Sequence, residues 1–425
     1  MITSGQSSSP LTCPGCGLGC DDLSWEMIEG TPRVNSHGCP IADDYFKPPA
    51  AAVAPHLVRG QAVELGHALK AATEILASAR MPVFIGPGGD IAAMQSLLAL
   101  ADQLGGVVDS RSRIVPINMQ VMQDSGLIAS TFSEVYNRAD LVLLVGGNPV
   151  PNWPRLLPRL MNNPQSMFRQ AKPRVIHLGT AIEPSQLPAG LDYQSIACSP
   201  AEILGTVAAL TTQFREDWRA AAPFLAAIAS VGETISAADY PVVIWDASNL
   251  CPTPAESVLA IDLVGEMIRF LSQKQRIVGM PLGGSDNAGG MASVMTWQTG
   301  FPNRLFYSPQ GPETSRYRDQ GLQLVAQHDA AVLVWVSTIL PYPPPEFAGK
   351  TIAIVADDFP EDESAKAEVV LRVGRLGIDH SGEFGRSDSV VMVPVPAAYP
   401  RERPRCDSVL DELLAGIKNL KGVRP

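Results

Sequence analysis

Short apolar runs alternate with amphipathic stretches along most of the chain, and this alternation predicts an α/β fold. Apolar runs of strand length, the expected strands, occur at 82–89, 106–109, 139–147, 173–179, 241–248, 276–279, 329–336 and 350–356. Apolar residues at helical spacing predict helices at 66–78, 91–104, 199–224, 226–236, 254–272 and about 406–420. Strands that are apolar on both faces and alternate with helices favour mostly parallel sheets that are covered on both sides.

The strand and helix pattern occurs twice, which predicts two Rossmann-like α/β units. The runs at 82–89, 139–147 and 173–179 are echoed at 241–248, 329–336 and 350–356. A Pro/Ala stretch at 47–55 predicts a boundary before the first unit. We therefore expect a four-cysteine module at 1–55, a first α/β unit at 56–236, a second α/β unit at 237–356 and a C-terminal segment at 357–425 that completes the first unit.

Four of the seven cysteines lie within the first forty residues, in the pattern C-x2-C-x3-C-x18-C. They are Cys13, Cys16, Cys20 and Cys39. Glycines between the first three let the loop fold closely enough for sulfurs to converge. Because thiolates bind both Zn²⁺ and iron–sulfur clusters, the spacing predicts a metal site and leaves zinc and a [4Fe–4S] cluster open.

Other interpretations of this cluster are a disulfide pair and an empty reduced site. His37 lies two residues before Cys39 and could replace one cysteine as a ligand. The remaining cysteines, Cys198, Cys251 and Cys406, are scattered and are expected to pack in cores.

The composition restricts the classes of function. Of 425 residues, 46% are hydrophobic and 18% are charged, and the net charge is −11. The negative charge argues against nucleic-acid partners and anionic membrane surfaces. The first residues lack a secretory signal, and no apolar run reaches transmembrane length. We expect a cytoplasmic protein.

Glycine-rich loops follow several expected strands, at 86–89, 146–148 and 283–290. Such loops can admit a phosphate at the carboxyl edge of a doubly wound sheet, although glycine is common at that edge in any case. His177 lies in an apolar run and is expected to be a hydrogen-bonded core residue. Trp153 and Tyr342, in proline-rich loops, are candidates for contacts with other subunits.

Several segments together resemble the B-subunit family of formylmethanofuran dehydrogenase, which is related to molybdenum or tungsten pterin formate dehydrogenases. These segments are CPGCGLGCDD at 13–22, NRADLVLLVGGNPVPNWPR at 137–155, NAGGMASVMTWQTGFP at 287–302 and GPETS at 311–315. The resemblance implies a formate dehydrogenase-like fold (domains I–III) with the four cysteines as metal ligands.

Two departures from the family pattern bear on function. The resemblance implies a Cys-His or selenocysteine-His pair where this chain has 114–117, which contains no metal-binding side chain. It also implies an arginine where this chain has Gly283, and Asp286 adds a negative charge to that loop. No Cys-His dipeptide occurs anywhere in the sequence.

With these two positions lost, the chain is most similar to the B subunit of the bacterial formyltransferase/hydrolase complex. The resemblance implies a redox-inactive structural subunit without catalytic or cofactor-binding residues and without a Mo/W-pterin. Its complex converts formyl-tetrahydromethanopterin to formate via a formyl-methanofuran-like carrier, with amidohydrolase-like, formyltransferase and accessory subunits as partners. The alternatives are an active Mo/W-pterin dehydrogenase subunit that uses Asp109, Ser110 or Ser112 as ligand, and a module that binds a pterin or nucleotide without chemistry.

Overall fold

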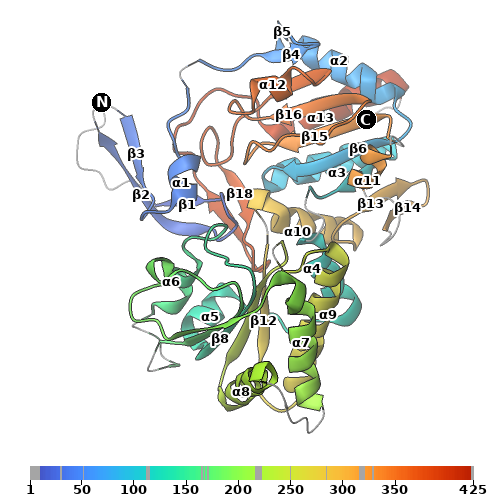
Figure 1. The fold of residues 1–425 in the computed structure, drawn as a ribbon. Helices are drawn as coiled ribbons and strands as arrows, with labels where there is room; N and C mark the ends of the chain where they lie inside the picture. Colours follow the sequence, from blue (N-terminus) through green and yellow to red (C-terminus); the bar gives the residue numbers. More distant parts are fainter. Residues whose placement is uncertain are drawn as a thin grey trace. The chain divides into compact units, whose positions relative to one another are not determined.

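The computed structural model divides the chain into two compact units, which we describe separately (Figure 1). Unit 1 comprises residues 1–112 and 284–425, and unit 2 comprises residues 113–283. The structure describes residues 10–28, 31–50, 52–111, 115–163, 166, 168–169, 172–215, 223–248, 250–283, 285–314, 321–327 and 330–422. The observed boundaries, between 112 and 113 and between 283 and 284, differ from the predicted ones after residues 55, 236 and 356, because unit 2 is inserted within unit 1.

Unit 1 contains a nine-stranded sheet with the order β14-β13-β7-β6-β15-β16-β17-β4-β5. The five central strands are parallel, and two hairpins pair antiparallel at the edges. The strands are β4 (His56–Val58), β5 (Gln61–Val63), β6 (Pro82–Gly88), β7 (Val107–Asp109), β13 (Leu305–Ser308), β14 (Gly311–Thr314), β15 (Val332–Ser337), β16 (Lys350–Val355) and β17 (Val369–Arg372). The similar apolar runs predicted two consecutive α/β units. Instead, runs from distant parts of the sequence, such as β6 and β15, pair within one sheet.

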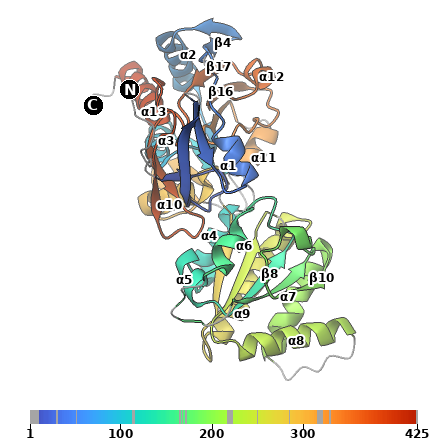
Figure 2. The ribbon, with the colours of Figure 1, turned by 90° about the vertical axis from the view of Figure 1, so that its left-hand side faces the viewer.

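Helices cover both faces of this sheet. In Figure 2, α3 and α13 lie on one side of it, and α11 and α12 lie on the other. The first face forms one core with α2 (Leu65–Ser78), α3 (Ile91–Leu104), α10 (Ala288–Thr299) and α13 (Cys406–Lys421). The second face packs against α11 (Gly321–Ala326) and the loop that precedes α12 (Glu361–Ser364). Because both faces are covered, the central strands are buried as continuous apolar runs.

The cysteine-bearing segment belongs to unit 1. It forms a three-stranded antiparallel sheet of β1 (Leu11–Cys13), β2 (Cys20–Ile28) and β3 (Thr31–Asn35), followed by α1 (Pro40–Tyr45). A second antiparallel hairpin, β18 (Gly382–Gly385) and β19 (Met392–Val395), lies near the C-terminus. This hairpin belongs to the C-terminal segment expected at 357–425.

Unit 2 contains a five-stranded parallel sheet with the order β10-β9-β8-β11-β12. Its strands are β8 (Leu141–Gly146), β9 (Arg174–Gly179), β10 (Tyr193–Ala197), β11 (Pro241–Asp246) and β12 (Val278–Leu282). One face packs against α4 (Val115–Ser125), α7 (Pro200–Arg215), α8 (Pro223–Ala237) and α9 (Pro254–Leu271). Figure 1 shows α5 (Phe132–Arg138) and α6 (Leu156–Met161) on the side opposite α7 and α9.

Helix ends follow local rules in both units. Asp90 caps the start of α3 and Gly105, with a φ of 64°, ends it, as expected for an N-cap carboxylate and a left-handed C-cap. Thr253 and Glu256 form a reciprocal capping box at the start of α9. In the part of the chain that the structure describes, no helix is both long and apolar enough to cross a bilayer.

Candidate functional site

The four-cysteine loop is the first candidate site. Cys13 ends β1 and lies opposite Cys20, which begins β2, while Cys16 lies in the turn between the strands and Cys39 precedes α1. All four side chains are at most 6% exposed. Gly17 and Gly19 adopt φ values of 89° and 59°, which glycine tolerates and which let the loop turn back on itself.

The cysteine thiols interact electrostatically with one another. Burial raises the pKa of Cys13 well above its usual value, and charge on neighbouring cysteines contributes to that rise. Burial, together with charge on Cys20 and Cys39 and against backbone hydrogen bonds that lower it, raises the pKa of Cys16 to about 12. Without a cation nearby, the thiols of Cys13 and Cys16 stay protonated. Four buried sulfur donors, three at the β1–β2 turn and one before α1, fit the chemistry of Zn²⁺ or an iron–sulfur cluster.

The side chains as they stand are not in ligating positions. Among the described residues, no three histidine, cysteine, aspartate or glutamate side chains are arranged to hold a metal ion. The sulfurs would therefore have to turn toward a common centre to bind one. His37 is exposed, and its Nε2 donates to the backbone carbonyl of Asp22 at 2.9 Å.

The C-terminal part of unit 1 holds the cysteine loop in place. The amide and the hydroxyl of Ser387 both donate to the carbonyl of Gly17, at 2.9 and 2.8 Å. The hydroxyl of Tyr45 in α1 donates to the carbonyl of Leu376 at 2.6 Å. Because these partners are far apart in the sequence, the segment at 1–55 folds as part of unit 1.

The second candidate site lies where the strand order of unit 1 reverses. The chain runs from β6 through α3 to β7 in one direction, and from β15 to β16 in the other, so β6 and β15 meet at the reversal. In doubly wound sheets, ligands bind outside the carboxyl ends of the strands at such a switch point. The glycine loop at 86–89 lies at this position.

Hydrogen bonds within the chain close this glycine loop. The amide and the hydroxyl of Thr338 donate to the carbonyl of Gly88 at 2.7 and 2.6 Å. The side-chain amide of Asn287 donates to the carbonyl of Gly89 at 2.8 Å and its oxygen accepts from the amide of Gly385 at 2.9 Å. Asn287 is fully buried. The loop is thus tied to β15, α10 and β18.

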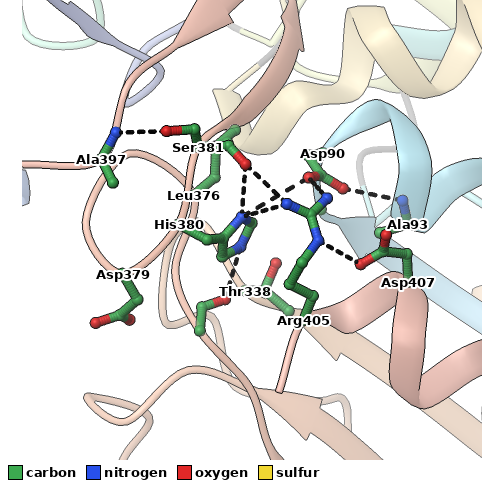
Figure 3. Close-up of polar contacts among 12 residues, drawn as sticks. Asp90, Ala93, Thr338, Leu376, Asp379, His380, Ser381, Ala397, Arg405 and Asp407 are labelled. Carbon is green, nitrogen blue, oxygen red and sulfur yellow. Dashed lines mark hydrogen bonds and ion pairs between the residues drawn. The ribbon is translucent and has the colours of Figure 1, made fainter. Parts of the chain in front are cut away.

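A buried carboxylate occupies the N-terminus of α3 (Figure 3). Asp90 accepts from the amide of Ala93 at 2.9 Å and from Arg405 at 3.0 Å, and it lies 4.0 Å from Nδ1 of His380. Arg405 also donates to Asp407 at 2.9 Å. A helix N-terminus is a common position for a bound anion, and here the anion is the chain's own carboxylate.

Asp286 lies at the switch point itself. The amide of Leu340 donates to its carboxyl group at 3.2 Å, and a Cβ atom added at Gly88 would overlap that carboxyl group. Burial raises the pKa of Asp286 to about 8, although the charges of Arg111 and Arg375 and the hydrogen bond from Leu340 lower it. The negative charge expected at this position is thus largely absent at neutral pH.

The structure describes only part of the positions where the resemblance implies a Cys-His pair and an arginine, at 114–117 and Gly283. Ile114 and Ser112 lie outside the described residues, 115–117 form the start of α4, and Gly283 is half-buried. Asp109 uses both carboxyl oxygens on backbone amides, those of Gly321 and Ser110, each at 2.8 Å. Because both carboxyl oxygens already accept hydrogen bonds that hold the loop, Asp109 is not well suited as a metal ligand.

The switch point of unit 2, between β8 and β11, is also tied by side chains. His177 is fully buried, donates to the carbonyl of Gly146 at 3.1 Å and accepts from Tyr193 at 2.9 Å, so its prediction as a hydrogen-bonded core residue is confirmed. Burial lowers the pKa of His177. Trp153 is only 4% exposed, so it lies in the core and not, as predicted, at a surface for partners.

Sequence reasoning missed Asp90, His380, Arg405 and Arg111 as site residues. Asp90 is brought together with His380 and Arg405, which both lie more than 280 residues further along the chain. The only local signal was Asp90, a capping residue directly after the glycine loop and before a helical pattern.

In both sheets the strand order reverses once, and the loops at the reversal are closed by hydrogen bonds within the chain. These features define a two-unit α/β protein of the doubly wound class. No protein-family model matches the chain. A solved structure shares the fold: a chain of the formyltransferase/hydrolase complex (FhcABCD) from Methylorubrum extorquens in complex with methylofuran. The TM-score is 0.73 with 23% sequence identity, over 87% of this chain and 100% of that chain.

The sequence comparison identifies particular relatives. The B subunit of the formyltransferase/hydrolase complex Fhc of M. extorquens is 26% identical over 349 residues, which is 82% of this chain and 92% of the relative. The B subunit of the tungsten-containing formylmethanofuran dehydrogenase 2 of Methanococcus maripaludis is 24% identical over 422 residues, 89% of this chain and 91% of the relative. The resemblance indicated by the sequence motifs is confirmed.

Proposed function

We propose that this chain is a non-catalytic structural subunit of a formyltransferase/hydrolase complex, in the role of its B subunit. It covers 92% of the length of the Fhc B subunit of M. extorquens. The complex converts formyl-tetrahydromethanopterin to formate via a formyl-methanofuran-like carrier, and other subunits perform the chemistry. Its partners are the amidohydrolase-like, formyltransferase and accessory subunits, in the cytoplasm.

The single observation that carries the non-catalytic role is the closed N-terminus of α3. A cofactor with a pyrophosphate needs free backbone N–H groups at this position. Asp90 takes the amide of Ala93 and is held there by Arg405. Binding of a pyrophosphate would displace a buried carboxylate and break its ion pair with Arg405. The lack of a Cys-His dipeptide in the sequence supports the same conclusion.

We further propose that Cys13, Cys16, Cys20 and Cys39 hold either a [4Fe–4S] cluster or Zn²⁺ and that the cysteine segment and the two units correspond to domains I–III of formate dehydrogenase-like proteins. The bound group has a structural role, since the chain lacks the residues for redox chemistry. Metal binding by such a site is coupled to folding and contributes on the order of 10 kcal/mol. Support comes from the burial of all four thiols and their mutual electrostatic interaction.

Elemental analysis of the complex, purified through a tag on this chain, tests the proposal. We expect either about four iron atoms or about one zinc atom per chain, and only trace Mo and W. Stoichiometric Mo or W together with a pterin would refute the structural role. A dinucleotide bound without metal would instead indicate a binding module.

A variant separates a structural from a catalytic role. Asp90→Ala should lower the yield of assembled complex, because it removes the cap of α3 and one of the two carboxylates that pair with Arg405. The rate of formate release per assembled complex should stay the same. A lower rate at equal assembly would place this region in the chemistry.

A further inference from the structure

Contacts between the cysteine-bearing segment and the rest of unit 1 converge on one stretch near the C-terminus, residues 376–403, which we call the C-terminal clamp. The hydrogen bonds from Ser387 to Gly17 and from Tyr45 to Leu376 both join the cysteine-bearing segment to this stretch. β1 also packs against β19, which lies within the clamp. The cysteine loop is therefore held from outside by residues that follow it by several hundred positions.

The clamp also holds the linker that connects α1 to β4. Where the structure describes this linker, at 47–55, it forms neither helix nor strand, so its backbone carbonyls need partners from elsewhere. Alternate side chains of the clamp donate to carbonyls at the start of the linker and along it. These hydrogen bonds run from Tyr399 to Phe46 at 3.0 Å, from Arg401 to Ala50 at 3.1 Å and from Arg403 to Ala54 at 2.7 Å.

Two largely buried carboxylates fix the arginines of the clamp. Asp379, whose side chain is 4% exposed, accepts from Nε of Arg401 at 2.5 Å. Asp357 accepts from Arg401 and from Nε of Arg403, each at 3.2 Å. Because removing one partner of a buried ion pair leaves the other charge uncompensated, the closed arrangement should be lost cooperatively when one arginine is replaced.

In the closed arrangement the thiols of the cysteine site have almost no access to solvent. All four are at most 6% exposed, and a bound metal ion has to pass the atoms that cover them. Exchange of a buried group with solvent proceeds through local opening. For the cysteine-bearing segment to separate from unit 1, its hydrogen bonds to the clamp have to break.

We propose that the C-terminal clamp is a gate for the cysteine site. The thiols exchange metal with the solution when the clamp is released, and closing the clamp traps the Zn²⁺ ion or iron–sulfur cluster. The part that concerns the metal rests on the proposed function, whereas the gating of the thiols does not. Since 331 positions separate Tyr45 from Leu376, a growing chain has its cysteine-bearing segment long before its clamp, and the metal is inserted in that open state.

Alkylation of the thiols tests the gate in the full-length chain as purified. Labelling by N-ethylmaleimide is followed at each cysteine by mass spectrometry, and metal release is followed with a chelator. Arg403→Met breaks the bonds to Asp357 and Ala54, while Glu402→Gln, at an exposed position of the clamp, is the matched control. We expect Arg403→Met to speed both labelling of the four thiols and metal release by roughly tenfold or more. Labelling of Cys198 in unit 2, which is 4% exposed, should not change.

Three results would overturn the gate. They are a folded Arg403→Met chain whose four thiols react as slowly as in the wild type, labelling of Cys198 that speeds up by the same factor, and wild-type thiols that react as fast as free cysteine. If Arg403→Met does not fold, Tyr399→Phe decides instead. It removes one hydrogen bond to the linker and should speed labelling by roughly threefold, and an unchanged rate contradicts the gate. Labelling tests the gate even in a chain that holds no metal, whereas metal content tests the proposed function.

Discussion

Replacing Asp286 by asparagine should change how the stability of unit 1 depends on pH. Asparagine keeps the shape of the side chain, tolerates the left-handed backbone and accepts from Leu340 in the same way, but it cannot ionise. Burial raises the pKa of Asp286 from 3.8 to about 8 in the folded chain, against the opposing effects of Arg111 and Arg375. The Tyr45 side chain also interacts electrostatically with Asp286.

The sign and the size of the effect follow from this pKa. The unfolded chain releases the proton near pH 4 and the folded chain holds it until about pH 8, so the wild type loses stability as pH rises through this window. A difference of about four pKa units, at about 1.4 kcal/mol each, amounts to on the order of 5 kcal/mol. Asp286→Asn should therefore gain on the wild type as pH rises and keep that gain above about pH 8.

Urea unfolding of both proteins, at intervals between about pH 5 and pH 9, measures this difference. Asp262→Asn, on the exposed side of α9 in unit 2, is the matched control and should follow the wild-type profile. Parallel profiles for the wild type and Asp286→Asn would show that Asp286 ionises in the folded chain at its ordinary pH, and the burial argument would fail.

Three further predictions address other parts of the structure. Ser387→Ala removes a buried hydrogen bond to Gly17 and should cost about 1 kcal/mol, with faster release of iron or zinc to a chelator; an unchanged release rate would argue against a role in holding the cysteine loop. Asp90→Ala should destabilise by about 1 to 3 kcal/mol and Asp90→Asn by less, because asparagine still caps α3; equal urea midpoints for the two variants would contradict the capping argument. Leu143→Ala, in the core of unit 2, should cost about 2 to 5 kcal/mol in urea unfolding, whereas Leu259→Ala, 55% exposed, should change it by less than about 0.5.

Local elements followed from the sequence where one physical signal dominated. The helices expected at 91–104, 254–272 and about 406–420 are confirmed as α3, α9 and α13, whose apolar spacing marks one buried side. The sequence analysis did not predict helix α10, because its own small and apolar residues are spread over most sides of the helix. Such a sequence shows no helical period. Most of the expected helix at 199–224 is confirmed as α7, described over Pro200–Arg215, and residues 216–222 lie outside the described part of the chain.

The arrangement of the strands and most of the second site could not be predicted. β6 pairs with β15, about 250 residues further along the chain, and no local pattern specifies such a partner. Asp90 at the start of α3 and Arg405 at the start of α13 are likewise brought together by contacts between distant segments, since α13 packs against α3. The four cysteines were found because their spacing is a short-range signal, although spacing does not show how far each sulfur must turn to bind a metal.

The insertion of unit 2 within unit 1 has a consequence for biosynthesis. Residues 113–283 are contiguous and can fold as soon as they leave the ribosome, whereas β6 must wait for β15 and the C-terminal segment. At ~5–20 residues per second, the last ~140 residues take roughly 7 to 28 s to emerge. Throughout that delay the apolar edge of β6 is open to nascent neighbours, so cells that produce this chain should depend on chaperones that shield it.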